Sequence, residues 1–403
     1  MKTLSFRPGR LRLWYILSVM FLVCGFQPSE NIEVDLSRNK EIVVRFPNNY
    51  TLINSSKGMV RHFASCSFIQ LETNPKCRIG NITKILIHKE RVYILEMGRN
   101  QSVFIFDLQG KWISTLAKIG KGPGEYQSLT DIFINPDNTS LNLVDSDNEK
   151  IMQFDLDGKT LMGEQPVASA IESAEILGEG IVTYSNIQSI TGRDNPRITY
   201  YTDKTMHSVG YTALPIAKGW ENVIQYPGNE LWNQNGEIYY PEPLQNKIYK
   251  LEKNGIFLMY TFDFKRLNPD REVTFKEFLD LSSTEKAEKI QRIRRFSLIP
   301  DGFVIEVNYE FSNKLVFLTH NCKRIETYVV SQNPLAKPLT FGYSVGLTNG
   351  LLITQILPRD IGYWVNMPEY ATKYPEASQL IRRDVRRPVR VDDNPILCLY
   401  RLK

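Results

Sequence analysis

The chain has 403 residues, of which 42% are hydrophobic and 23% charged, and its formal net charge is +5. This composition is typical of an ordinary globular protein of one or two domains. The weak charge, without a basic run interleaved with aromatic residues on a recognisable module, excludes a nucleic-acid-binding protein.

The first predicted element is a signal peptide. Basic residues up to Arg12 precede the eleven-residue apolar run Leu13–Val23. This run has the length of a signal-peptide core and falls short of the roughly 20 residues that span a bilayer. We therefore expect residues 1–24 to be a signal peptide, residues 25–60 to be a tether or an outer strand, and the protein to be exported.

Cys24 follows the apolar run directly and resembles the acylated cysteine of a bacterial lipoprotein signal. Phe21 and Val23 depart from that pattern, which prefers Leu three residues before the cysteine and a small residue just before it. Two interpretations stay open. Lipid attachment at Cys24, with a membrane anchor, is favoured over an ordinary cleaved signal with an incidental cysteine.

The segment Ile119–Lys159 contains the clearest structural unit. Its short apolar runs Asp131–Ile134, Leu141–Val144 and Ile151–Phe154 are separated by turns rich in Gly, Pro, Asn and Asp. Short strands with this punctuation predict an antiparallel meander. The high content of aromatic residues, which suit a half-buried pleated surface, also favours strands.

The start of the third strand recurs along the chain. In each copy a polar residue, a basic residue or a proline comes directly before an apolar residue that begins a strand with alternating apolar positions. The six apolar residues are Val103, Ile151, Ile198, Ile248, Leu315 and Ile396. The first four lie 48, 47 and 50 residues apart, and the last two gaps of 67 and 81 equal one period plus an insertion. A period near 50 with about four strands predicts an all-β, six-bladed β-propeller of four-stranded antiparallel blades.

The ends of the chain predict how the ring closes. Asn394–Lys403 has the pattern of the third strand of a blade, so the last blade lacks a fourth strand of its own. The segment Ser67–Glu72 precedes the first innermost strand, Ile82–Ile87, and could supply it. Such pairing removes an open sheet edge, and we expect residues 61–403 to form the propeller.

The segment Gly120–Lys159 resembles an NHL repeat. The matching residues are Gly120, Gly122, Gly124 and Tyr126 in the loop and Asp145, Asn148, Lys150 and Ile151 at the third strand.

Residues 67–85, residues 235–251 and the terminal DNPILCLYRLK resemble a family of six-bladed propeller lipoproteins common in Bacteroidetes. This resemblance covers roughly residues 60–403. It implies a propeller exported to the outer membrane or cell surface, with the periplasmic side as the alternative, and it implies no particular chemistry.

Acidic and basic residues recur on either side of the turn before the third strand. The acids are Glu96, Asp145 and Glu242, and the bases are Lys150, Arg197, Lys247 and Lys314. A carboxylate in this position can accept backbone N–H groups of the loop and meet the cation at its rim. Because a catalytic site would occur once, the repetition favours a structural role.

The loop Gly120–Gly124 is followed by a strand rather than a helix, so we expect an inter-blade turn with glycines at positive φ and not a phosphate loop. The histidines, His62, His88, His207 and His320, stand in non-equivalent places, and no dense Asp/Asn cluster stands out. We therefore expect neither a metal nor a cofactor. No Gly-x-Ser-x-Gly elbow supports a hydrolytic nucleophile.

Four cysteines follow Cys24, namely Cys66, Cys77, Cys322 and Cys398. Export would permit disulfides, and Cys66 and Cys77 are the closest pair in sequence. No Cys-x-x-Cys spacing indicates zinc. Free buried thiols are favoured.

Three long insertions interrupt the blades. They are residues 185–196, residues 265–292 and residues 357–393. The second joins blades four and five and carries Thr274-x-x-Glu277, which predicts a short helix. Loops of these types emerge on one face of a propeller, so we expect all three around the channel mouth.

The third insertion supplies the candidate binding residues. Aromatic side chains beside guanidinium groups suit sugar rings, carboxylates or a protein partner. The residues proposed to bind ligand are Tyr363, Trp364, Tyr370, Arg382 and Arg383, with Tyr374 and the rest of the arginine cluster beside them. The alternative is that the aromatic residues pack the loop onto the ring and the arginines form a solvated surface.

These observations favour a monomeric, non-enzymatic binding or scaffold protein for a glycan, peptide or protein partner. The alternative is an extracytoplasmic enzyme of the lyase or lactonase type, since some six-bladed relatives have those activities. Three or more convergent His, Asp or Glu side chains in the channel would favour the enzyme.

Overall fold

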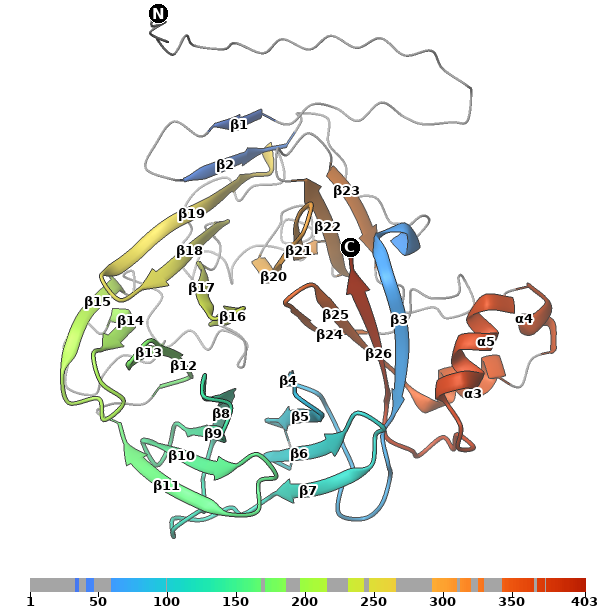
Figure 1. Cartoon of the computed structure of the whole chain (residues 1–403), viewed down its shortest axis with the longest axis horizontal. Coiled ribbons are helices and arrows are strands. Elements are labelled where there is room, and N and C mark those ends of the chain that lie inside the picture. Colours follow the sequence, from blue (N-terminus) through green and yellow to red (C-terminus); the bar gives the residue numbers. More distant parts are fainter. Residues whose placement is uncertain are drawn as a thin grey trace, which may run out of the picture.

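Short strands separated by turn residues assemble into six small antiparallel sheets around a ring (Figure 1). The protein is therefore an all-β, six-bladed β-propeller, as predicted. The computed structural model describes residues 33–35, 41–46, 59–98, 100–167, 171–185, 196–215, 231–242, 246–265, 292–309, 312–319, 325–329, 343–365, 368–373 and 375–403.

The first three blades each consist of four consecutive strands, ordered from the channel outwards. Blade one is followed around the ring by blades two and three. Blade one consists of β4 (Lys84–His88), β5 (Arg91–Glu96), β6 (Ser102–Asp107) and β7 (Trp112–Leu116). Blade two consists of β8 (Leu129–Ile134), β9 (Ser140–Asp145), β10 (Lys150–Asp155) and β11 (Leu161–Pro166). Blade three consists of β12 (Ser173–Leu177), β13 (Gly180–Tyr184), β14 (Pro196–Tyr201) and β15 (Val209–Pro215).

Blades four and five follow the same plan, and blade six takes its outermost strand from the beginning of the ring. Blade four contains β16 (Trp232–Gln234), β17 (Glu237–Glu242), β18 (Lys247–Glu252) and β19 (Gly255–Asp263). Blade five consists of β20 (Arg292–Ile299), β21 (Gly302–Tyr309), β22 (Ser312–Thr319) and β23 (Ile325–Val329). Blade six consists of β24 (Tyr343–Thr348), β25 (Leu351–Ile356), β26 (Ile396–Leu402) and β3 (Phe63–Gln70). All six predicted third-strand starts fall on third strands, namely β6, β10, β14, β18, β22 and β26.

The hydrophobic core lies between neighbouring blades. Alternate residues of a strand point to opposite faces of its sheet, and here each face packs against the next blade. For this reason β9 and β13 are buried at every residue. Six apolar clusters occupy the six interfaces; one of them joins Tyr93 of blade one to Phe154 of blade two.

Strand β3 closes the ring by pairing with β26, and the register runs from Ile396 opposite Gln70 to Leu402 opposite Phe63. The predicted closure by the segment from Ser67 is confirmed, although the strand begins earlier, at Phe63. A 3-10 turn, η1 (Met59–His62), leads into it.

Part of the N-terminal extension adds outer strands to blade four. Strand β2 (Ile42–Arg45) pairs in parallel with β19, and β1 (Glu33–Asp35) pairs with β2. Val44 and Phe46 are 0% and 1% exposed, so this short segment is anchored by apolar burial as well as by strand pairing.

The third insertion forms three short helices, α3 (Pro358–Val365), α4 (Pro368–Lys373) and α5 (Pro375–Asp384). Each begins with proline, which suits the first helical position because its missing N–H would be unbonded there. The helices lie outside the ring beside β3 (Figure 1). In the described part of the chain, no helix is both long and apolar enough to cross a membrane.

The expectation that this insertion surrounds the channel mouth is wrong. The physical reason is that β3 is an edge strand with unpaired backbone groups, and α5 covers it. The Asp384 carboxylate accepts the Phe68 N–H at 2.9 Å, and Ile381 is 2% exposed. Almost all of the other two insertions, including the predicted helix at Thr274–Glu277, lies outside the described residues.

Shortening Tyr400 should weaken ring closure. Its ring is fully buried and stacks on Phe63 with a centroid distance of 4.5 Å. The variant Tyr400→Ala should lose about 3–5 kcal/mol of unfolding free energy, measured by urea denaturation, because it removes a large buried aromatic side chain. The control Phe257→Ala, at a site that is 39% exposed, should lose less than about 1 kcal/mol. Equal losses in both variants would contradict this role of Tyr400.

Candidate functional site

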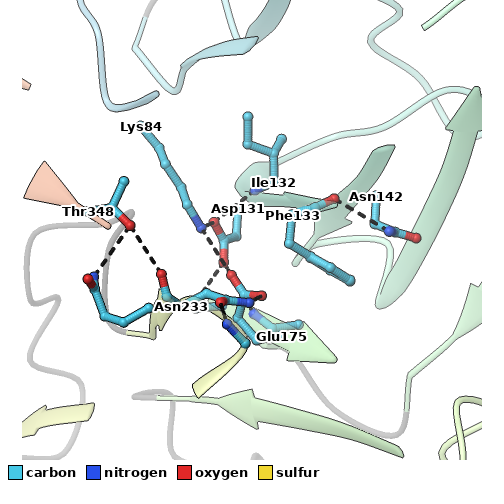
Figure 2. A network of polar contacts seen from close by, with 12 residues as sticks. Lys84, Asp131, Ile132, Phe133, Asn142, Glu175, Asn233 and Thr348 are labelled. Atoms are coloured by element: carbon cyan, nitrogen blue, oxygen red, sulfur yellow. Dashed lines mark hydrogen bonds and ion pairs between the residues drawn. The ribbon is translucent and has the colours of Figure 1, made fainter. Parts of the chain in front are cut away.

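The innermost strands bring a buried polar network into the channel. Lys84 on β4 places its Nζ 2.6 Å from Asp131 Oδ1 on β8, and 4.0 Å from Glu175 Oε1 on β12. Asp131 Oδ2 also accepts a hydrogen bond from the Ser173 hydroxyl at 2.5 Å. Figure 2 shows Lys84, Asp131 and Glu175 converging, with Asn233 of blade four donating to Glu175 at 3.2 Å. One cation thus serves two carboxylates from different blades.

The other side of the channel is linked in the same way. Arg295 on β20 donates to Glu306 at 2.8 Å and to the Ser344 carbonyl at 3.3 Å. Gln234 of blade four donates to the Phe296 carbonyl of blade five at 3.1 Å. Thr348 of blade six donates to the Asn233 carbonyl at 3.1 Å (Figure 2). Polar side chains therefore connect the inner ends of the blades to one another.

The channel network is largely neutral in charge. Burial raises the pKa of Glu175 to about 7, although the nearby Lys84 cation opposes the shift; the Asp131 charge adds to it. The carboxyl group is therefore partly protonated at neutral pH. The remaining charges of the network, on Lys84, Asp131, Arg295 and Glu306, balance in pairs.

The cavity in this channel measures about 70 Å³ and is lined by five innermost strands, from Lys84 around to Thr348. Such a volume suits a few water molecules and is too small for a sugar ring or a drug-sized ligand. Among the residues that the structure describes, no group of three or more His, Cys, Asp or Glu side chains could hold a metal ion. The arrangement acts as a buried polar connector between blades.

A larger cavity, of about 230 Å³, lies between blades five and six, near the C-terminus. Arg61 and His62 of η1 both contact Glu326 on β23, at 2.6 and 2.5 Å. His62 also stacks on Phe317 with a centroid distance of 4.2 Å. Burial alone would raise the pKa of Glu326, but hydrogen bonds from His62, Arg61 and Tyr328 outweigh it and hold that pKa well below its usual range.

Sequence reasoning missed this second site. The only signal was the polar pair Arg61-His62 directly before the closing strand. Of the other histidines, His88 ends β4 and its pKa is lowered, first by burial and then by Lys89 and Arg91. His207 is exposed, and His320 lies outside the described residues.

The repeated acidic residue of blade two, Asp145, forms hydrogen bonds with the backbone of the loop before β8. Asp145 accepts the backbone N–H groups of Gln127 and Ser128 at 3.1 and 3.0 Å. Lys150 lies opposite Asp145 in the register but pairs with Glu164 on β11 at 2.9 Å. The expected meeting of this cation with the repeated acid is therefore wrong; the neighbouring strand supplies a nearer carboxylate.

The acids of the other blades have their own partners. Glu96 accepts the Gly80 N–H at 3.0 Å. Glu242 accepts the Tyr249 hydroxyl at 3.0 Å and lies opposite Lys247 in the register.

The expectation that the loop glycines all adopt positive φ holds only for Gly124, at 72°. Gly120 and Gly122 provide space instead. A Cβ on Gly120 would lie 2.0 Å from the Glu125 carboxylate, which accepts the Gly122 N–H at 2.9 Å.

The structure places the candidate ligand-binding residues on the three helices of the insertion. Tyr363 and Trp364 belong to α3 and Tyr370 to α4. Arg382 and Arg383 lie in the last turn of α5 and are exposed. The side chains of the three aromatic residues, all of Tyr374 and the lipidation candidate Cys24 lie outside what the structure describes.

Replacing Glu175 should change how stability depends on pH. Its pKa of about 7 in the folded protein exceeds the unfolded value, so the folded state binds more protons between about pH 4.5 and 7. This contribution to stability is present below that range and is lost as pH rises, by up to about 3 kcal/mol. In urea unfolding between pH 5 and 8, the stability of Glu175→Gln should therefore rise relative to that of the parent as the pH increases. The difference between the exposed control Glu179→Gln and the parent should stay constant over the same range.

Comparison with solved structures is consistent with the ring. A Bacteroides fragilis protein designated as exported aligns with a TM-score of 0.70 at 14% identity, covering 90% of this chain and 99% of that chain. The WD40 repeats of RRP9 align with a TM-score of 0.45 at 9% identity, covering 88% and 100%. At these identities the first likeness shows the fold alone, and the second carries no argument. No curated protein matches this sequence.

Residues 47–401 match the family described as "Domain of unknown function (DUF4934)". The match extends from just after β2 into β26 and includes all six blades. On this evidence the chain belongs to the DUF4934 family.

Proposed function

We propose that this protein is an exported binding propeller that recognises a glycan bearing carboxylate groups, and that the helical insertion on the outside of blade six forms the binding surface. The observation that carries the proposal is a dense, exposed arginine segment on a firmly anchored support. Five arginines lie within nine residues and all are exposed: Arg382, Arg383, Arg386, Arg387 and Arg390.

The support for these arginines is well ordered by specific contacts. The Arg387 N–H donates to Gln70 Oε1 at 3.0 Å, and Gln70 Nε2 donates back to the Arg387 carbonyl at 2.9 Å. Arg383 bonds Asp384, which in turn holds the Phe68 N–H. A surface fixed before binding loses less conformational entropy when a ligand arrives.

The chemistry of the segment suits an acidic sugar chain. A guanidinium group binds a carboxylate through two parallel hydrogen bonds. Nearby acids, such as Asp384 and Asp392, engage Arg383 and Arg78, while Arg382, Arg386 and Arg390 remain exposed. The insertion also contains Tyr363, Trp364 and Tyr370, and aromatic residues in general suit sugar rings. Uronic acids combine both features.

The channel favours binding over the lyase or lactonase alternative. Its described carboxylates are engaged by cations, hydroxyls or amides, and its cavity of about 70 Å³ has no room for a sugar ring.

Export is supported by the N-terminal signal pattern and by the designation of the Bacteroides fragilis neighbour. We further propose lipid attachment at Cys24 and a site at the outer membrane or cell surface. We also propose that blade two, which contains the segment Gly120–Lys159, is an NHL-like repeat.

Removing three exposed arginines should weaken recognition of uronate. The triple variant Arg382→Ala, Arg386→Ala, Arg390→Ala should bind oligogalacturonate at least about tenfold more weakly in calorimetric titration, because each charged hydrogen bond contributes on the order of 1 kcal/mol or more. The control Lys111→Ala, Lys118→Ala, Lys121→Ala removes the same charge from another exposed surface and should bind like the parent. Absence of binding by the parent, or equal loss in both triples, would refute the proposal.

Replacing Cys24 should release the protein from membranes. The variant Cys24→Ala should lose incorporation of a fatty-acid label and move from the membrane fraction to the soluble exported fraction, because no acyl chain remains to bury. Labelling that persists in the variant would show that the anchor lies elsewhere.

A further inference from the structure

Two cysteines meet across the strands that close the ring. Cys66 on β3 and Cys398 on β26 are 332 residues apart in sequence, yet their sulfur atoms lie 3.5 Å apart. Cys398 is fully buried, and Cys66 is partly exposed on the outermost strand. In the thiol form, strand pairing and apolar packing hold these two elements together without a covalent link.

We propose that Cys66 and Cys398 form a disulfide bond in the exported protein and thereby fasten the first strand of the ring covalently to the last. This inference rests on the proposed export, because disulfides persist in extracytoplasmic compartments. It does not depend on glycan recognition.

The bond requires β3 to move slightly towards β26, because diagonal neighbours in an antiparallel pair usually have Cα atoms about 7–8 Å apart and disulfides usually join Cα atoms about 4.4–6.8 Å apart. Cys66 lies opposite Tyr400, and Cys398 lies opposite Phe68, so the two cysteines are diagonal neighbours on the same face of the sheet. The sulfur atoms must approach from 3.5 Å to about 2.05 Å, the length of a disulfide bond. Strand β3 is the outer strand of its blade, with one neighbouring strand rather than two, so it can shift towards β26 more easily than an inner strand could.

The environment of the two thiols sets the order of the chemical steps. Cys66 is partly exposed and can meet an oxidant, so it is the attacking thiol. Cys398 is fully buried, and burial with the adjacent Cys66 raises the pKa of its thiol well above the usual value. The Cys66 thiolate attacks one sulfur of an oxidant disulfide, forms a mixed disulfide and releases one oxidant thiolate. The Cys398 thiolate then attacks Cys66 Sγ and releases the second. Overall, two protein thiols are oxidised to one disulfide and the oxidant disulfide is reduced to two thiols.

Cys77 provides an internal control. It is fully buried, and its thiol donates to the Glu72 carbonyl at 3.3 Å. Burial raises the pKa of this thiol as well. Like Cys398 it is buried among apolar residues, although in the neighbouring cluster between blades six and one, and it is not paired with Cys66 or Cys398.

Peptide mapping tests the proposal directly. The full-length chain is produced with its signal, collected from the envelope, alkylated without reduction and digested with trypsin. The expected result is one linked species that joins residues 62–76 to residues 391–401, which contain Cys66 and Cys398 respectively and exclude Cys77. Reduction should release both peptides. Alkylated, unlinked peptides from the exported protein would overturn the proposal.

Thermal unfolding gives an independent measurement. Without reductant, Cys66→Ser and Cys398→Ser should each lower the Tm by on the order of 5 °C, because the bond restricts a very long loop in the unfolded chain. Cys77→Ser should keep the linked peptides, and its Tm should still fall on addition of dithiothreitol. A parent Tm that reductant does not change would contradict the proposal.

In a glutathione redox buffer, the purified reduced parent should regain the linkage. Failure to link under these conditions would refute the proposed geometry, whatever the outcome of glycan titration.

Discussion

The pairing of β3 with β26 is the constraint on which the rest of the molecule depends. It joins residues near the start of the ring to its last strand and turns a row of meanders into a closed circle. Each blade can then bury both faces against its neighbours, which is why whole strands such as β9 and β13 are inaccessible. A ring opened at this seam would expose the apolar clusters that flank blade six.

Different kinds of contact stabilise the outer and inner parts of the ring. Apolar residues fill the spaces between blades, where sheet surfaces are broad enough to pack. Near the axis, hydrogen-bonded polar groups such as Lys84, Asp131 and Arg295 connect the innermost strands. The buried charges are therefore explained by blade alignment. Candidate recognition residues lie outside the ring, on the exposed side of a helix that is itself anchored to β3.

Much of the fold could be predicted because its signals are local. Strand starts such as Val103 and Ile396 lie beside turn residues that repeat with the blade period, and the missing fourth strand of blade six follows from counting. The position of α5 could not be predicted, since it depends on the edge of a strand more than 300 residues away. The site of Arg61 and Glu326, and the meeting of Cys66 with Cys398, depend equally on distant pairing. The roles of Gly120 and Gly122 were mistaken because the obstacle, Glu125, is a side chain rather than a backbone angle.

Closure by the two extremes of the chain also governs how the protein is made. A ribosome delivers β3 early and β26 last, so blade six stays incomplete until synthesis is nearly finished. Throughout that interval the growing chain carries an unpaired strand edge, the kind of surface that recruits other strands and starts aggregation. We therefore expect β3 to be the strand that most needs protection during biogenesis, although α5 covers it in the finished ring.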